Sequence, residues 1–157
     1  QLYPEAVIQP VRGNVLTRLE KLDSGEYGAL ILAEAGLKRL GLSDRIAYRF
    51  SPEELVPAAG QGILAIQTRA GEYADLLARL NSPDGALCAK TERQLASLLG
   101  GDCSAPVGCH AQLHGTDMTL YGFSSIGGVP RYGSVQGNRN DADLLVQQLA
   151  SKLTITE

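Results

Sequence analysis

Cys103 is the residue whose surroundings most clearly suggest chemistry. It lies in the run LGGDCSAPVGCH, residues 99–110, between a helical pattern and an alternating pattern typical of a strand. The neighbouring Gly100 and Gly101 allow unusual backbone angles and the close approach of a bulky group. Three roles compete for this thiol: a packed core residue, a metal ligand and a covalent attachment point.

The other two cysteines fit a structural role. Cys88 shares a helical pattern with several leucines, and Cys109 falls on the apolar side of an alternating run, so we expect both to be small buried hydrophobes. A metal site of Cys103, Cys109 and His110 is poorly supported, because no second cysteine pair is present and Cys109 and His110 point to opposite faces of a strand. We therefore expect no metal.

Local charge disfavours a permanently reactive thiolate at Cys103. The residue follows the C-terminal end of an expected helix, where the macrodipole is negative, and Asp102 is its immediate neighbour. Both features favour the neutral thiol. Neither His110 nor His114 has the surroundings of a catalytic partner for a cysteine nucleophile. The pattern is more typical of a thiol that is modified once and stays modified.

Three arginines form a second group with chemical potential. Arg12 and Arg18 bracket the start of an expected helix, where free backbone N–H groups favour anions. Arg39 follows an expected buried strand at its carboxyl end, where open α/β sheets bind ligands. Arginines there suit carboxylates or phosphates. An ordinary surface or ion-paired role competes with this one, and it is the role we expect for Lys38 and Arg45.

Composition limits the classes of function. The chain has 157 residues, of which 44% are apolar and 20% charged, with a net charge of −3. These values are typical of a soluble globular protein and give no general attraction to nucleic acid or to an anionic membrane. No apolar run approaches the ~20 residues of a membrane span. The chain opens at Gln1 in the middle of a pattern, so we expect an N-terminal part to be missing.

The elements that must position these residues follow two different secondary-structure patterns, one in the first part of the chain and one in the last. The first part alternates expected strands with helices and is α/β in class; the strands are at 6–11 and 27–33, and the helices at 15–22 and 35–41. A segment rich in proline and glycine follows and contains an expected strand at 63–67. The last part has helices at 72–80, 83–99 and 142–153 around three short strands, which predicts a three-stranded antiparallel sheet beginning near Val107.

Three blocks carry a resemblance to the porphobilinogen deaminase (hydroxymethylbilane synthase) family. They are VRGNVLTRLEKLDSGEYGALILAEAGLKRLGL at 11–42, VPAAGQGILAIQTR at 56–69 and GGDCSAPVG at 100–108. Their order agrees with the family, and the similarity runs over nearly the whole chain. The residue before the attachment cysteine is usually small in the family, and Asp102 departs from that pattern.

The resemblance implies a transferase of tetrapyrrole (heme and chlorophyll) biosynthesis. Such enzymes join porphobilinogen units head to tail, release ammonia at each addition, and free hydroxymethylbilane. A dipyrromethane cofactor is held by a thioether, and by motif match its attachment residue is Cys103. Arg12 and Arg18 match catalytic arginines that bind pyrrole acetate and propionate groups. Arg39, Gln61 and Gly62 match residues that line the substrate site.

The resemblance also implies the domain organisation. We expect a partial α/β domain resembling periplasmic binding proteins plus a small α+β domain with a three-stranded antiparallel sheet and helices. Residues 1–55 would be the later part of domain 2, 56–80 the returning segment of domain 1, and 81–157 the cofactor-carrying domain 3. The catalytic aspartate is expected in the missing N-terminal part, so this chain alone should be inactive.

The expected partners are porphobilinogen, the growing polypyrrole and the missing part of the same protein. We expect a monomer when full length, located in the cytoplasm, or in an organelle stroma if the missing N-terminus carries a transit peptide. The competing interpretation, from another class, is a non-catalytic anion-binding module of periplasmic-binding-protein type with an incidental cysteine. An intact-mass measurement distinguishes the two, because only the first interpretation predicts a covalent dipyrrole adduct.

Overall fold

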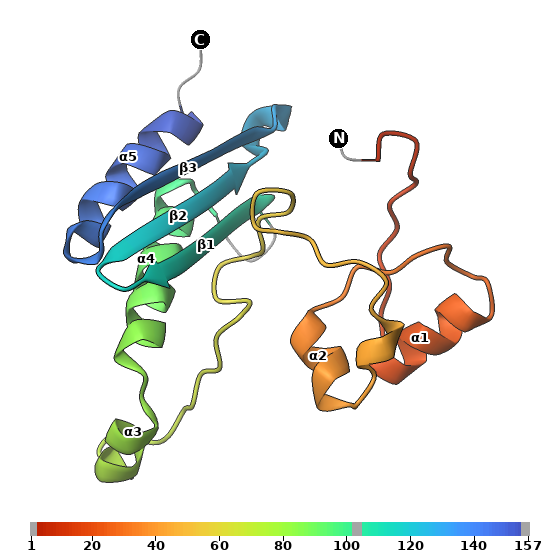
Figure 1. Cartoon of the computed structure of the whole chain (residues 1–157), viewed down its shortest axis with the longest axis horizontal. Helices are drawn as coiled ribbons and strands as arrows, with labels where there is room; N and C mark the ends of the chain where they lie inside the picture. Colours follow the sequence, from red (N-terminus) through yellow and green to blue (C-terminus); the bar gives the residue numbers. More distant parts are fainter. Residues whose placement is uncertain (1–2, 102–104, 155–157) are drawn as a thin grey trace. The chain divides into compact units, whose positions relative to one another are not determined.

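The computed structural model describes residues 3–101 and 105–154. The chain divides into two compact units, Gln1–Phe50 and Ser51–Glu157 (Figure 1). Asp102 and Cys103 fall outside the described residues. Within the described ranges, no helix combines the length and the apolar character needed to cross a membrane.

The first unit is built on two short helices. Helix α1 spans Val15–Asp23, and α2 spans Glu34–Arg39 and is followed by a single 3-10 turn at Ser43–Arg45. Both helices were predicted from the sequence and are confirmed. Leu19 and Leu37 are the buried apolar side chains of this unit.

The strands predicted at 6–11 and 27–33 are not formed. Among residues 3–50 the structure contains helices, turns and irregular segments but no strand. Val7 is 84% exposed and Ile31 is 66% exposed, although both lie in runs whose composition is typical of buried strands. A strand needs a neighbour that pairs with its N–H and C=O groups, and this unit offers none. The α/β class predicted for the first part is therefore corrected to helices joined by unpaired apolar segments.

The second unit contains a sheet and three helices. Helix α3 spans Ala74–Leu80 and α4 spans Pro83–Leu98; they precede strands β1 (Val107–His114), β2 (Asp117–Ser124) and β3 (Arg131–Asn138), and α5 (Ala142–Thr154) closes the unit. The strands pair antiparallel in the order β1-β2-β3. The predicted three-stranded antiparallel sheet with helices is confirmed. The strand predicted at 63–67 is not formed, and Leu64 there is 76% exposed.

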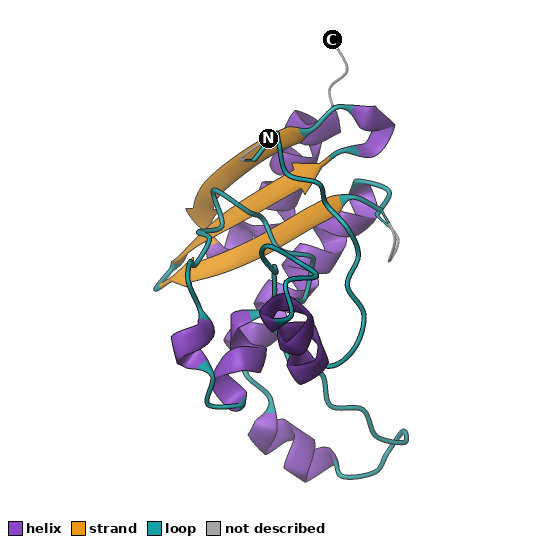
Figure 2. Cartoon of the chain, turned by 90° about the vertical axis from the view of Figure 1, so that its right-hand side faces the viewer, coloured by secondary structure: helices purple, strands orange, loops and turns teal. Residues whose placement is uncertain are grey.

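Helices α4 and α5 cover one face of this sheet and make the core with it (Figures 1 and 2). Leu95 of α4, Leu149 of α5 and Leu120 of β2 are fully buried there. Gly122 of β2 lets the helices approach closely, because a Cβ added to it would lie 2.6 Å from a Leu153 methyl carbon. The alternating strands thus bury one face, as their sequence predicts.

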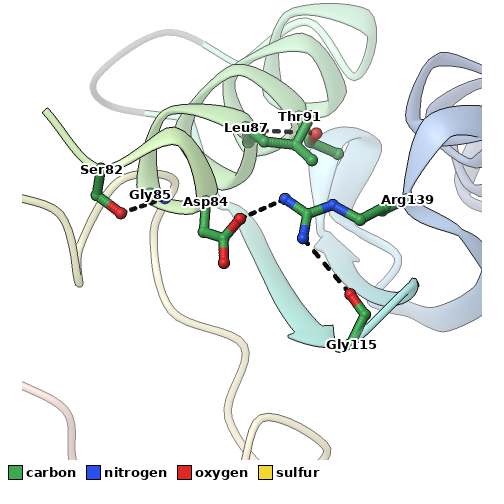
Figure 3. A network of polar contacts seen from close by, with 7 residues as sticks. All are labelled: Ser82, Asp84, Gly85, Leu87, Thr91, Gly115 and Arg139. Carbon is green, nitrogen blue, oxygen red and sulfur yellow. Dashed lines mark hydrogen bonds and ion pairs between the residues drawn. The ribbon is translucent and has the colours of Figure 1, made fainter.

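A polar network fastens the start of α4 to the far end of the sheet (Figure 3). Ser82 caps the helix by accepting a hydrogen bond from the Gly85 amide at 3.1 Å. The Asp84 carboxylate accepts from the Arg139 guanidinium, which also donates to the Gly115 carbonyl at 3.4 Å. Arg139 lies just after β3 and Gly115 lies in the turn between β1 and β2. The network therefore holds helix, hairpin and the approach to α5 together.

Candidate functional site

Arg12 and Arg18 flank the start of α1, as the sequence predicts. Asn14 caps the helix, and its side-chain oxygen accepts a hydrogen bond from the Thr17 amide at 2.9 Å. Arg18 turns back along the helix and donates through Nε to the Gly13 carbonyl at 2.8 Å. The first turn holds no acidic residue. The partial positive charge of the helix end is therefore not compensated within the helix, which favours an anionic ligand beside the two arginines.

The basic side chains of the first unit fall into two groups. Four of them pair with carboxylates, as Lys21–Glu26, Lys38–Glu34, Arg45–Asp23 and Arg49–Glu34. The hydrogen bond from Lys38, followed by that from Arg49, holds the pKa of Glu34 below its usual value. The ion-paired role expected for Lys38 and Arg45 is thereby confirmed.

The remaining three basic residues of this unit are Arg12, Arg18 and Arg39. None of them forms an ion pair within residues 3–101 and 105–154. These are the arginines that the sequence analysis selected. Guanidinium groups that fold without a carboxylate partner keep their bidentate donors available for the carboxylates of a ligand.

Arg39 lies in a different setting from the one predicted. It occupies the last turn of α2 and is exposed, and the segment before that helix is not a strand. A cation in the last helical turn is favoured by the helix dipole. The prediction that Arg39 follows the carboxyl end of a strand is therefore wrong in this unit, because the expected strand lacks a partner.

Gln61 and Gly62 lie in tight turns of the second unit. Gly60 has a φ of 75°, which favours glycine. The Gln61 amide donates to the Ala58 carbonyl and the Ile63 amide donates to the Gly60 carbonyl, both at 3.0 Å. Both residues are exposed. A Cβ added to Gly62 would meet nothing within 4 Å, so the space beside this turn is open.

The segment that leads to these turns is fastened to the sheet. The Cys109 amide on the free edge of β1 donates to the Pro57 carbonyl at 2.8 Å. Tyr121 on β2 donates through its hydroxyl to Glu53 at 2.7 Å, which raises the pKa of Tyr121 and lowers that of Glu53. The segment before Gln61 is thus attached to the sheet by these two hydrogen bonds.

Glu92 is the residue of this region that the sequence analysis missed. It is buried in α4, and its carboxylate accepts hydrogen bonds from the Gly60 amide at 2.7 Å and the Ala111 amide at 2.9 Å. The signal was available in the sequence: Glu92 shares the helical spacing of Cys88, Leu95 and Leu99, so it stands on the apolar side of its helix. A carboxylate at such a position needs internal donors.

The described cysteines have the structural role that the sequence predicts. Cys109 is completely buried in the core, and Cys88 is half-buried against it. Burial raises the pKa of Cys109 to about 12, with a further contribution from the negative charge of Glu92. Burial also raises the pKa of Cys88. Because both thiols pack in or against the core, Cys103 remains the candidate for covalent attachment, although it lies outside the described residues.

The residues that flank Cys103 in sequence border a hollow of about 260 Å³. It is lined by residues 55–56 and 105–108 together with Phe123 and Tyr132, whose ring centroids are 4.7 Å apart. The lining carries no charged side chain, so it suits the face of an aromatic ring rather than a carboxylate. A dipyrromethane presents both pyrrole rings and carboxylates. The apolar and aromatic lining of this hollow in the second unit fits a pyrrole ring, and the first unit separately offers arginines that fit carboxylates.

Metal binding finds no support in the described ranges. Residues 3–101 and 105–154 contain no group of three or more histidine, cysteine, aspartate or glutamate side chains arranged to hold a metal ion. Cys109 of the metal site considered above is committed to the core.

Comparison with known families gives two consecutive matches. Residues 1–76 match the family model described as "Porphobilinogen deaminase, dipyromethane cofactor binding domain", and residues 86–154 match "Porphobilinogen deaminase, C-terminal domain". This chain belongs to the porphobilinogen deaminase family. The resemblance recognised in the three sequence blocks is thereby confirmed, and Cys103 falls within the second match.

Curated relatives support the same membership. The chain is 45% identical to the porphobilinogen deaminase of Thiobacillus denitrificans over 155 residues, which cover 96% of this chain and 51% of the relative. It is 47% identical to that of Chromobacterium violaceum, with 96% and 50% covered. It is 42% identical to that of Ruminiclostridium josui, with 98% and 53% covered. The chain spans about half the length of the curated relatives it matches.

Proposed function

We propose that this chain supplies the arginine-bearing and cysteine-bearing part of an enzyme that polymerises porphobilinogen into hydroxymethylbilane. The observation that carries the proposal is the division among the basic residues of the first unit. Arg12, Arg18 and Arg39 stand without a carboxylate partner in the described structure, whereas the other four basic residues of that unit are paired. Each porphobilinogen brings acetate and propionate groups, which such guanidinium groups bind well.

Each candidate residue has a distinct role in this proposal. Cys103 holds the dipyrromethane by a thioether, and that group, when bound, supplies the chain end to which pyrroles are added. Arg12 and Arg18 bind the carboxylates of cofactor and substrate and hold them in place during successive additions. Arg39, Gln61 and Gly62 contact the incoming substrate. Guanidinium groups placed beside an anion bind it through local charge, so the proposal is compatible with a net charge of −3 for the whole chain.

The proposed activity also needs residues that this chain does not contain. The aspartate that serves pyrrole nitrogens in the family has no matching acid here, and we place it in the part of the relatives that this chain does not match. The same part would complete the periplasmic-binding-protein-like domains. The unpaired apolar segments at 6–11, 27–33 and 63–67 support this, because they have strand composition and no strand partner. The full-length enzyme would be a cytoplasmic monomer.

The test of the attachment residue is an intact-mass measurement on full-length protein produced with its cofactor. Cys103→Ser is expected to lose the mass of the dipyrromethane completely, whereas Cys88→Ser is expected to keep it. Cys88 is a matched control because it is another thiol of the same unit and only half-buried. A Cys103→Ser protein that still carries the adduct would remove Cys103 from the site. Unmodified wild-type protein would favour the non-catalytic anion-binding alternative.

A further inference from the structure

The buried carboxylate of Glu92 has no part in the chemistry proposed above. Its residue is 3% exposed and lies on the core side of α4. Burying a carboxylate among apolar side chains is costly unless hydrogen-bond donors replace the lost water. A leucine at the same helical spacing would pack without that cost. The hydrogen-bond donors around Glu92 therefore indicate why a carboxylate stands at this position.

Each carboxylate oxygen of Glu92 accepts a hydrogen bond from a backbone amide of a different segment. Oε2 accepts from the Gly60 amide at 2.7 Å, in the segment before α3. Oε1 accepts from the Ala111 amide of β1 at 2.9 Å, and the Nδ1 atom of His110 lies 3.4 Å from the same oxygen. One side chain of α4 thus joins the turn at Gly60 to the middle of β1.

The segment that Glu92 holds at Gly60 makes further contacts with β1 a few residues earlier in the sequence. The segment approaches β1 so closely that a Cβ added to Gly108 would lie 2.6 Å from the Val56 carbonyl oxygen. The Cys109 amide donates to the Pro57 carbonyl at 2.8 Å. After Gly60, however, the chain leaves the sheet, and Gln61 and Gly62 are exposed. The bond to Glu92 is the last attachment to the α4–β1 region before those two residues.

We propose that Glu92 is a positioning residue that fixes the backbone at Gly60 and thereby sets the placement of Gln61 and Gly62 relative to β1. Strand β1 begins at Val107, soon after Cys103 in the sequence. The role in substrate binding rests on the proposed function, in which Gln61 and Gly62 contact substrate. The mechanical part, a carboxylate that holds two backbone segments together, does not depend on it.

The variant that tests this role is Glu92→Gln. Glutamine keeps the volume of the side chain, but its amide has one accepting oxygen and an NH₂ group that cannot accept from a backbone N–H. Either Gly60 or Ala111 then loses its acceptor. The matched control is Thr91→Val at the neighbouring position. Thr91 is also fully buried, and its hydroxyl donates only within α4, to the Leu87 carbonyl at 2.8 Å (Figure 3).

The first readout is amide hydrogen exchange in the present chain. In the wild type, the Gly60 amide should exchange more slowly than the Leu64 amide, which makes no backbone hydrogen bond among the described residues. In Glu92→Gln, exchange at Gly60 should accelerate by about tenfold or more relative to Thr91→Val, because a charge-assisted bond is lost. Exchange at Leu120 in β2 should stay the same in both variants. An unprotected Gly60 in the wild type would overturn the proposal even if Glu92→Gln failed to fold.

The second readout is steady-state kinetics of the full-length enzyme with porphobilinogen. Glu92→Gln should raise KM by about tenfold, with a smaller change in kcat, while Thr91→Val keeps both, because a displaced Gln61–Gly62 backbone weakens binding. An inactive wild type would overturn the proposed function and leave the exchange experiment to decide the mechanical role. Accelerated Gly60 exchange together with an unchanged KM in an active enzyme would overturn the role in substrate binding.

Discussion

The two units of the chain use similar apolar sequences with opposite results. In the second unit, the alternating run at Val107–His114 pairs with its neighbour and buries Cys109 and Ala111 completely or nearly so. In the first unit, the apolar runs at 6–11 and 27–33 remain unpaired, and Val7, Ile8 and Ile31 within them are exposed. Composition alone is therefore insufficient for a strand. The β1–β2 and β2–β3 pairs succeed because each partner is adjacent in sequence.

The largest effect is expected when the unpaired segments receive partners. This chain alone should release no ammonia from porphobilinogen. Adding the unmatched half of a curated relative as a separate polypeptide should slow amide exchange in 6–11, 27–33 and 63–67, because strand pairing protects amides by orders of magnitude. Exchange within β2 should not change. Catalytic ammonia release by this chain alone would break the proposed division of labour, and unchanged exchange in all three segments would show that they are not strands awaiting partners.

The next effect concerns the large apolar core of the second unit. Leu149→Ala should lower the free energy of unfolding of that unit by about 2–5 kcal/mol, because it removes a fully buried side chain between the helices and the sheet. Ile31→Ala, in the exposed run of the first unit, should change stability by less than about 0.5 kcal/mol. Urea unfolding followed by circular dichroism measures both. An equal decrease in the free energy of unfolding for the two variants would mean that Ile31 is buried in solution. The difference in burial between the two units would then be false.

A smaller effect is expected for arginine substitutions in the first unit, which distinguish an arginine that binds substrate from one that only forms an ion pair. In the full-length enzyme, Arg18→Leu should weaken transition-state binding by about 1.5–3 kcal/mol, as expected for one charge-assisted bond. Its folding stability should change little, because Arg18 has no carboxylate partner within the described residues and loses only an exposed hydrogen bond to the Gly13 carbonyl. Arg45→Leu is the control, since Arg45 pairs with Asp23 at an exposed position and should leave kcat/KM unchanged. Near-normal turnover of Arg18→Leu would remove Arg18 from the site.

Sequence reasoning succeeded where the signals are local. The predicted helices at 15–22 and 83–99 agree with α1 and α4 to within a residue, because a local cap, Asn14 or Ser82, begins each of them. The hairpin strands were found because turns and alternation occur together. The strands expected at 6–11, 27–33 and 63–67 were wrong for this chain because their pairing would be non-local. A sequence pattern reports the preference of a segment and not the presence of its partner.

For the candidate site too, the sequence predicted the local features and missed those that depend on distant segments. Arg12 and Arg18 were placed correctly because a helix start is a local feature. Arg39 was assigned to the end of a strand that does not form. The helical spacing shows Glu92 on the apolar side of its helix, but its role depends on donors from Gly60 and Ala111, which lie far from it in sequence. Contacts between distant segments become visible only in three dimensions. The assignments of Cys103, Arg12, Arg18, Arg39, Gln61 and Gly62 to the reaction stay predictions until the variants are measured.

The exposed apolar runs also have a consequence for the self-association of this polypeptide. Val7, Ile8, Ile31 and Leu64 offer β-prone backbone to any other chain that can pair with it. We expect self-association to grow steeply with protein concentration, through these runs and not through the sheet of the second unit. In a cell, the same runs are the kind of sequence that chaperones and proteases select. Any segment that pairs with these runs should therefore reduce the self-association.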